Sequence, residues 1–253
     1  MTKKNGLKKN EPSKNTEIIQ VSDIAERLDE LTECFNENLG GTEFNVRSFQ
    51  ALKIPAGGST MWSIQTLEDE QAVKQITGII IARQPGIKLL WDQGEPSGQP
   101  PICVGYKNRG EGTPGGNCRT CDFNKFGSKI NPDGSTGKGK ACKDVYQVFF
   151  LMAGDLMPVR LPLPVMSIPR ITDYLILLTR GLKKSHDVVT SVSLEKATNS
   201  QGQPYARAKF SFVRDLNADE KPIVESYRKM FNTILDTATR GYQLIDGTEY
   251  DGE

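Results

Sequence analysis

Four cysteines gathered in one stretch of the chain have the residue type and the spacing of a metal site. They are Cys103, Cys118, Cys121 and Cys142, and the central pair forms a Cys-x-x-Cys motif. Two thiolates at this spacing can close on one ion, and four are a common ligand set for a structural zinc ion. The sequence therefore predicts that structural zinc organises a loop inserted at about 95–143.

Two other roles for these cysteines fit their surroundings less well. A cysteine can serve as a small buried hydrophobe, which suits Cys34 because it lies at helical spacing from Leu31. The cluster instead lies among Gly, Asn, Pro and Lys residues. A disulfide requires an oxidising compartment, but the first residues contain lysines without the apolar stretch of a secretion signal. We therefore expect a cytoplasmic protein with reduced cysteines.

Positive charge is concentrated in the same loop. Between Cys103 and Lys143, eight lysines and arginines face three acidic residues. The whole chain of 253 residues has a formal net charge of only +1, so this excess is local. A loop that is fixed by a metal and rich in lysine is suited to phosphate groups, which indicates a polyanion as the partner.

The two ends of the chain carry opposite charge. Residues 1–14 contain five lysines and one glutamate, whereas the last thirteen residues contain four acidic residues and no cation. We predict a flexible basic arm at 1–21 and an acidic tail at 244–253 that competes for the basic surface or contacts partner proteins. The alternative is that each end is only a solvated terminus.

Hydrophobic periodicity predicts a mainly β protein with flanking helices. One helix is expected within 22–39, after an N-cap at Ser22, and a final helix at 217–243. Gln84-Pro85-Gly86 has the composition of a hairpin turn between two apolar segments. The other expected elements are strands at Val46–Ile54, Met61–Leu67, Val73–Arg83, Ile87–Trp91, Val145–Ala153, Met157–Pro164, Val188–Lys196 and Tyr205–Asp215, and a helix at 168–183.

Several strands, one helix and then a two-strand hairpin form the element order of an OB-like five-stranded barrel, so we expect an α+β protein. The predicted nucleic-acid-binding domain spans 22–216, with the cysteine loop as an insertion and the helix at 217–243 packed after it. No apolar run in the sequence approaches the length of a membrane span, so we expect no membrane partner.

Alternation with period two in the last hairpin separates two faces. The face expected in the core consists of Ala206, Ala208, Phe210 and Phe212. The opposite face consists of Tyr205, Arg207 and Lys209. An exposed ring beside cations can stack on a base and neutralise phosphates at the same time. An ordinary strand with a polar outer face has the same pattern.

An aromatic residue between two lysines adds a second candidate, inside the cysteine loop. Phe126 lies between Lys125 and Lys129, so its ring could stack on a base beside neutralised phosphates. The complete set expected to bind nucleic acid is Lys125, Phe126, Lys129, Lys138, Lys140, Tyr205, Arg207 and Lys209. Further aromatic candidates are Trp62, Trp91 and Tyr106.

Signatures of an enzyme are weak. The chain has a single histidine, His186, which follows a predicted helix among lysines. The glycines from Gly110 to Gly115 match a dinucleotide-binding pattern, but no helix opens after them. The segment from Gly134 to Lys140 is close to a P-loop, but Ala141 stands where a magnesium-binding hydroxyl is needed. We therefore expect a protein without enzymatic activity.

Taken together, Trp91, the four cysteines, Phe126-Gly127-Ser128 and the segment from Gly137 to Lys143 resemble the single-stranded DNA-binding proteins of phages and mobile elements that carry a zinc-stabilised insert. The resemblance implies an OB-type fold and a role in coating single-stranded DNA during replication or recombination, in a bacterial cell or a phage-infected host. It also implies that the acidic tail contacts other replication proteins.

Two other classes of function stay open on the sequence alone. A zinc-ribbon subunit of a transcription or primase assembly would use the same cysteines but bind protein. A metal-dependent nuclease would need a cluster of carboxylates or histidines, and the sequence offers neither in a recognisable pattern.

Overall fold

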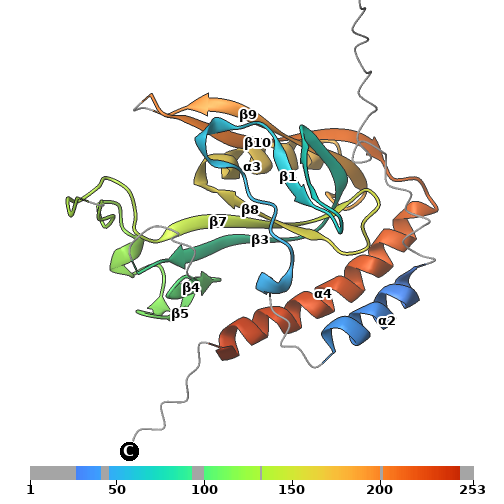
Figure 1. The fold of residues 1–253 in the computed structure, drawn as a ribbon, viewed down its shortest axis with the longest axis horizontal. Helices are drawn as coiled ribbons and strands as arrows, with labels where there is room; N and C mark the ends of the chain where they lie inside the picture. The colour runs from blue at the N-terminus through green and yellow to red at the C-terminus, as the bar shows by residue number, and fades with distance from the viewer. Residues whose placement is uncertain (1–26, 41–45, 93–99, 132, 200–201, 246–253) are drawn as a thin grey trace, which may run out of the picture.

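The computed structural model describes residues 27–40, 46–92, 100–131, 133–199 and 202–245, and its main component is β-strand (Figure 1). The helices are α2 (Leu28–Leu39), α3 (Ile168–Arg180) and α4 (Glu220–Ile245), with short 3-10 turns at Val46–Ser48, Ala56–Gly58, Asp122–Asn124 and Val165–Ser167. The strands are β1 (Trp62–Gln65), β2 (Glu70–Val73), β3 (Gln75–Leu90), β4 (Cys103–Tyr106), β5 (Arg109–Gly112), β6 (Gly116–Asn117), β7 (Lys143–Met152), β8 (Val159–Pro164), β9 (Val188–Thr198) and β10 (Pro204–Asp215). The expectation of a mainly β protein with flanking helices is confirmed.

The long strand β3 lies at the centre of the main sheet. It pairs with β9 at its beginning, with β7 from Gly78 to Leu89, and with β4 over its last three residues. Strand β8 pairs with β7, and β10 pairs with β9, all antiparallel. The resulting order is β8-β7-β3-β9-β10, with β4, β5 and β6 added at the far end of β3. Strands β1 and β2 form a separate two-stranded sheet.

The predicted five-stranded barrel is not observed as a closed barrel. Within the described residues, hydrogen bonds join eight strands into one sheet, and no pairing connects β8 to β10. The turn before α3 occupies this position: the backbone N–H of Ala208 on β10 donates to the hydroxyl of Ser167, at 3.1 Å. The hydroxyl of Ser167 thus binds a backbone N–H of β10 that a neighbouring strand would bind in a closed barrel.

The predicted hairpin at Gln84-Pro85-Gly86 is wrong, because the strand continues through it. The register of β3 against β7 shifts between Gln84 and Ile87, which identifies a β-bulge. Pro85 has no N–H for the ladder, and Gly86 adopts a φ of 72°, which glycine accepts readily. The two residues bulge outward and the strand resumes at Ile87.

The predicted strand at Val46–Ile54 is also wrong. It forms a 3-10 turn at Val46–Ser48 and a single bridge between Ala51 and Arg160 of β8. Val46, Phe49 and Leu52 are buried, but they are spaced three residues apart, which fits a turn followed by an edge contact and not an alternating strand.

Two apolar cores lie on opposite faces of the sheet. One is enclosed by β1, β2, α3 and the inner faces of the strands, and Trp62 is completely buried there with its indole N–H donating to Val192 O at 3.1 Å. The other lies between the sheet and α4, which runs beneath the sheet beside α2 (Figure 1). In this second core the ring of Phe231 on α4 packs against Phe149 of β7, with centroids 5.4 Å apart.

The C-terminal helix begins with a capping box. Asn217 Oδ1 accepts from the N–H groups of Asp219 and Glu220, while Glu220 Oε2 accepts from the N–H of Asn217. This reciprocal arrangement satisfies backbone donors that the first turn leaves open. The expected start of the helix near Asn217 is therefore confirmed. The basic arm at 1–21, the expected cap at Ser22 and residues 246–253 of the acidic tail lie outside the described residues.

Among the described residues, no helix is long and apolar enough to cross a membrane.

One acidic side chain lies unfavourably beside α4. Burial raises the pKa of Asp155 from 3.8 to about 6. The folded state thus binds a proton more tightly than the unfolded chain, so it is favoured at pH below 4 and loses this advantage as the pH rises through 6. Asp155→Asn should therefore raise the free energy of unfolding at pH 7 by up to about 3 kcal/mol and change it little at pH 4.

Denaturant unfolding at both pH values measures this effect, with Asp173→Asn on the exposed face of α3 as the matched control. An equal change for Asp155→Asn at pH 4 and pH 7 would contradict the assignment.

Candidate metal site and basic insertion

The end of β3 brings the two ends of the cysteine loop together. On one edge, Leu90 is opposite Cys103 of β4. On the other edge, Leu89 is opposite Lys143 of β7, the residue that follows Cys142. Leu90, Cys103 and Cys142 consequently form a small buried cluster of their own. Two cysteines far apart in the sequence meet because one strand pairs on both of its edges.

A tight hairpin positions the next thiol. Strands β4 and β5 are joined by a two-residue turn in which Lys107 and Asn108 both have positive φ, 49° and 67°. The N–H of Cys118 donates to Asn108 O at 2.9 Å. A β-carbon on Gly105 would lie 2.6 Å from Cys118 Sγ, so the thiol rests directly against the glycine backbone. Glycine at this position is required by the close approach of sulfur.

The Cys-x-x-Cys loop is held by hydrogen bonds to its own backbone. The side chain of Asn124 donates to Cys118 O at 2.7 Å, and the N–H of Asn124 donates to Cys121 O at 3.1 Å. The N–H of Cys142 donates to Phe123 O at 2.9 Å, which joins this loop to the last cysteine. These bonds fix where the thiols lie relative to one another.

All four cysteines line one small cavity. The space between them is about 10 Å³, close to the volume needed for one water-sized sphere. Cys103, Cys118 and Cys142 are buried and Cys121 is half-buried. Within the described residues, no group of three or more histidine, cysteine or acidic side chains already has the arrangement of a metal site. The four cysteines nevertheless line the same small space. Four sulfur ligands are also the number and type that a structural zinc ion prefers.

Electrostatics disfavour four free thiolates in this space. Burial raises the pKa of Cys142 to about 11, and burial followed by the nearby Cys103 raises the pKa of Cys118. Lys88, which lines the same cavity, acts in the opposite direction on both thiols, but it offsets only part of the rise in their pKa. Lys88 forms an ion pair with Asp144, which also binds Lys140 at 3.2 Å. A cation that bound all four sulfurs would relieve the repulsion that the thiolates exert on one another.

The predicted cations of the insertion differ in how they are engaged. Lys125 forms an exposed ion pair with Asp122 at 2.6 Å. Lys140 donates to Asn124 Oδ1 at 3.2 Å and lies over the ring of Phe126, 5.1 Å from its centroid. Lys138 is exposed, and Lys129 is half-buried. Phe126 itself is 81% exposed, which is unusual for a phenylalanine and leaves its ring available for contact.

The predicted cations on β10 are a separate group. Lys209 is exposed and Tyr205 is half-buried. Arg207 forms an ion pair with Glu195 of β9 at 2.6 Å, and Glu195 also binds Arg170 at 3.3 Å. The tip of the β9–β10 hairpin and the insertion project separately from the same end of the molecule in Figure 1. The structure thus places the two predicted sets at one end without joining them into one cluster.

The alternation predicted for β10 holds over most of the strand. Ala206, Ala208 and Phe210 are buried, as expected. The prediction is wrong for Phe212, which is 45% exposed; the register of β10 shifts directly after it, between Phe212 and Arg214. A bulge adds one residue and turns the following side chains to the other face.

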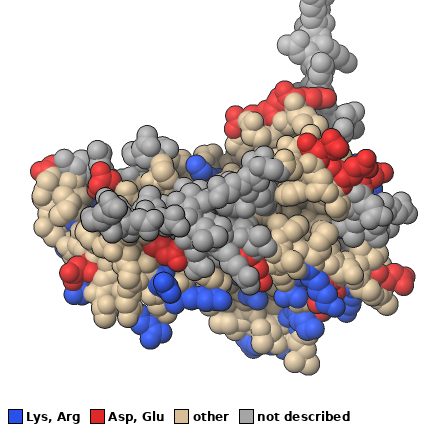
Figure 2. Space-filling model, turned by 90° about the horizontal axis from the view of Figure 1, so that it is seen from below, with Lys and Arg blue, Asp and Glu red and all other residues tan. Residues whose placement is uncertain are grey.

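Charge is unevenly distributed over the surface. Figure 2 shows lysine and arginine atoms gathered along the lower edge of the view, whereas acidic atoms are frequent at its upper right. Such a separation favours an anionic partner on one side of the molecule.

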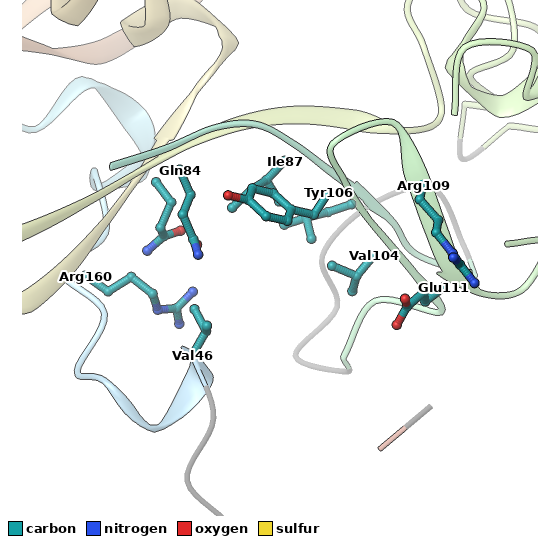
Figure 3. A pocket seen from close by; sticks show the side chains of 10 residues that line it. Val46, Gln84, Ile87, Val104, Tyr106, Arg109, Glu111 and Arg160 are labelled. Atoms are coloured by element: carbon teal, nitrogen blue, oxygen red, sulfur yellow. The ribbon is translucent and has the colours of Figure 1, made fainter. Parts of the chain in front are cut away.

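A second cavity was not anticipated from the sequence. It is lined by Gln84 of β3, Gln147 of β7, Arg160 of β8 and Tyr106 of β4, with several apolar residues (Figure 3). The available signal was a glutamine inside the apolar run of β7. Of the other aromatic candidates, Trp62 is buried, and Trp91 is half-buried.

Comparison with known proteins finds no match for this chain among family models, curated proteins or solved structures.

Proposed function

We propose that this chain is a non-enzymatic single-stranded DNA-binding protein that acts in DNA replication or recombination. The observation that supports it best is the strand order β8-β7-β3-β9-β10 with α3 between β8 and β9. This is the order of an OB fold whose first to fifth strands are β3, β7, β8, β9 and β10. OB folds bind oligonucleotides on the face of their second and third strands, between the loop after the first strand and the loop before the fifth.

One predicted binding set lies on the first of those loops, and the other lies on the strand that follows the second loop. The loop between β3 and β7 is the cysteine-containing insertion with Lys125, Phe126 and Lys138. The loop between β9 and β10 leads into Tyr205 and Lys209. The sequence alone selected these residues by charge and aromatic spacing, and they lie on or next to the two loops that an OB fold uses to hold a strand of nucleic acid. This agreement supports the proposal.

Zinc has a structural role in this proposal. Cys103, Cys118, Cys121 and Cys142 would hold it, and the ion would supply a crosslink that closes the insertion. A zinc ion bound by four thiolates carries a net negative charge, so the adjacent Lys88 favours it. Because the Cys-x-x-Cys motif is followed by backbone that carries the exposed ring of Phe126, closing the loop would also orient the binding residues.

The predicted binding residues contribute unequally in this proposal. Lys138 and Lys209 are exposed and suited to phosphate groups. Phe126, with Lys140 beside its ring, is suited to stacking on a base. Arg207 must break or share its ion pair with Glu195 to contact a phosphate, so we expect the smallest effect there. A tail at 244–253 that competes for this surface or contacts replication proteins remains part of the proposal.

A protein-binding zinc-ribbon subunit is the second candidate. It is favoured by apolar side chains left at the surface of α3 and just after it, where Ile176 is 53%, Leu177 61% and Leu182 96% exposed. Exposed apolar residues of this kind often contact protein. An oligonucleotide titration separates the two candidates, because only the first requires affinity for nucleic acid.

Salt dependence tests the phosphate contacts. Affinity for labelled oligo-dT, measured by fluorescence anisotropy, should fall steeply with salt, with a logarithmic slope of about −0.7 for each phosphate contact. Lys138→Ala should make this slope shallower by about 0.7. The matched control is Lys74→Ala, an exposed lysine just before the opposite end of β3, which should leave the slope unchanged.

Duplex DNA and RNA of equal length should be included in the same titration. Affinity for oligo-dT that is independent of salt, or equal slopes for wild type and Lys138→Ala, would contradict the proposed contacts.

Stacking on Phe126 is tested by removing and then restoring the ring. Phe126→Ala should weaken binding of oligo-dT by about 1–3 kcal/mol, because one stacked base loses its platform. Phe126→Trp keeps an aromatic face and should retain the affinity. The side chain is exposed, so neither change should alter the thermal unfolding midpoint. Equal affinity of Phe126→Ala and wild type would remove this ring from the interface.

A further inference from the structure

A cavity on the outer face of the sheet is lined by a buried side-chain amide, that of Gln147, whose N–H group has no hydrogen-bond partner within the described residues. The cavity measures about 70 Å³, room for several water-sized spheres, and lies among β3, β4, β7 and β8 (Figure 3). Gln147 of β7 lines it and is only 3% exposed. Its side-chain Nε2 has no hydrogen-bond partner within the described structure. A buried amide donor in this state destabilises the fold.

Gln147 lies where an apolar side chain would avoid this destabilisation. It lies on the same face of β7 as Phe149, two residues away, which packs against Phe231 of α4. Leucine would continue that apolar face and remove the unsatisfied donor. Buried polar groups that lack a partner in the fold need another explanation, and a ligand that supplies an acceptor is one.

The walls of the cavity define the chemistry of such a ligand. Apolar side chains and the ring of Tyr106 form one part of the wall, and the carboxamides of Gln84 and Gln147 with the guanidinium of Arg160 form the other. In Figure 3, Tyr106 points toward Gln84, and Arg160 faces the same space. A flat ring with hydrogen-bonding groups along one edge matches this combination.

The cavity is less suited to a bare phosphate. Arg109 and Glu111 both line it, so a negative charge accompanies the two arginines. In Figure 3 these two residues lie at the end of the cavity away from Arg160 and Gln84. A neutral ring fits this mixture of charges better than a free anion does.

We propose that this cavity holds one nucleobase and recognises its edge through Gln147. The inference rests on the proposed function, because β7 and β8 are the second and third strands of the OB order. The Nε2 group of Gln147 donates, so the base must present an acceptor. All four bases carry such an acceptor, a carbonyl oxygen in thymine, cytosine and guanine and a ring nitrogen in adenine, so this donor can meet the edge of any base.

The test compares wild type with Gln147→Leu in the full-length chain. The substitution should lower affinity for oligo-dT about three- to tenfold, the value of one neutral hydrogen bond. The thermal unfolding midpoint should stay the same or rise, because an unsatisfied buried donor is removed. Gln75→Leu, at an exposed glutamine on β3, is the matched control and should leave the affinity unchanged.

A nitrogen-15 NMR spectrum of the side-chain amides separates this inference from the proposed function. The signal that Gln147→Leu abolishes should shift when oligo-dT is added, and free thymidine tests whether an unlinked base suffices. If oligo-dT binds equally to wild type and Gln147→Leu, the cavity inference is overturned while DNA binding stands. If no oligonucleotide binds, the proposed function is overturned. In that case a shift with thymidine supports base recognition, and no shift overturns it.

Discussion

The pairing of β3 on both of its edges is the constraint on which the rest of the structure depends. Its first residues pair with β9, most of the strand pairs with β7, and its last residues pair with β4 on one edge and β7 on the other. The bulge at Pro85 and Gly86 lets one strand make these contacts by bending without ending. Because both ends of the insertion are fixed to the same end of β3, Cys103 and Cys142 must lie close together. The cysteine cluster is thus a consequence of sheet topology before any metal is considered.

This arrangement links the cysteine cluster to the surface that we propose binds DNA. Lys88 of β3 stands next to the thiols and pairs with Asp144, and Asp144 holds Lys140 near the exposed ring of Phe126. A short series of contacts therefore leads from the central strand, through the charge balance of the cysteines, to an aromatic ring at the surface. On the other side of the sheet, α4 covers Phe149 and leaves the cavity at Gln147 beside the insertion.

The sequence predicted the features that depend on local patterns. The alternation from Tyr205 to Phe210 and the start of the last helix at Asn217 both involve residues close in the chain, where spacing determines geometry. It failed where distant residues decide the outcome. The Gln84-Pro85-Gly86 segment has the composition of a turn, but β7 pairs with both of its sides and holds it in one strand. Likewise, the ion pair of Arg207 with Glu195 and the cavity at Gln147 arise from strands brought together by the fold.

The central claim is that β3 gathers four thiols into a zinc site that shapes a DNA-binding insertion. Native mass spectrometry of the purified full-length chain, without added metal, tests it most directly. The account predicts one zinc ion for each chain, lost together with oligo-dT binding when a chelator removes the metal. A metal-free mass with undiminished binding of oligo-dT would contradict it.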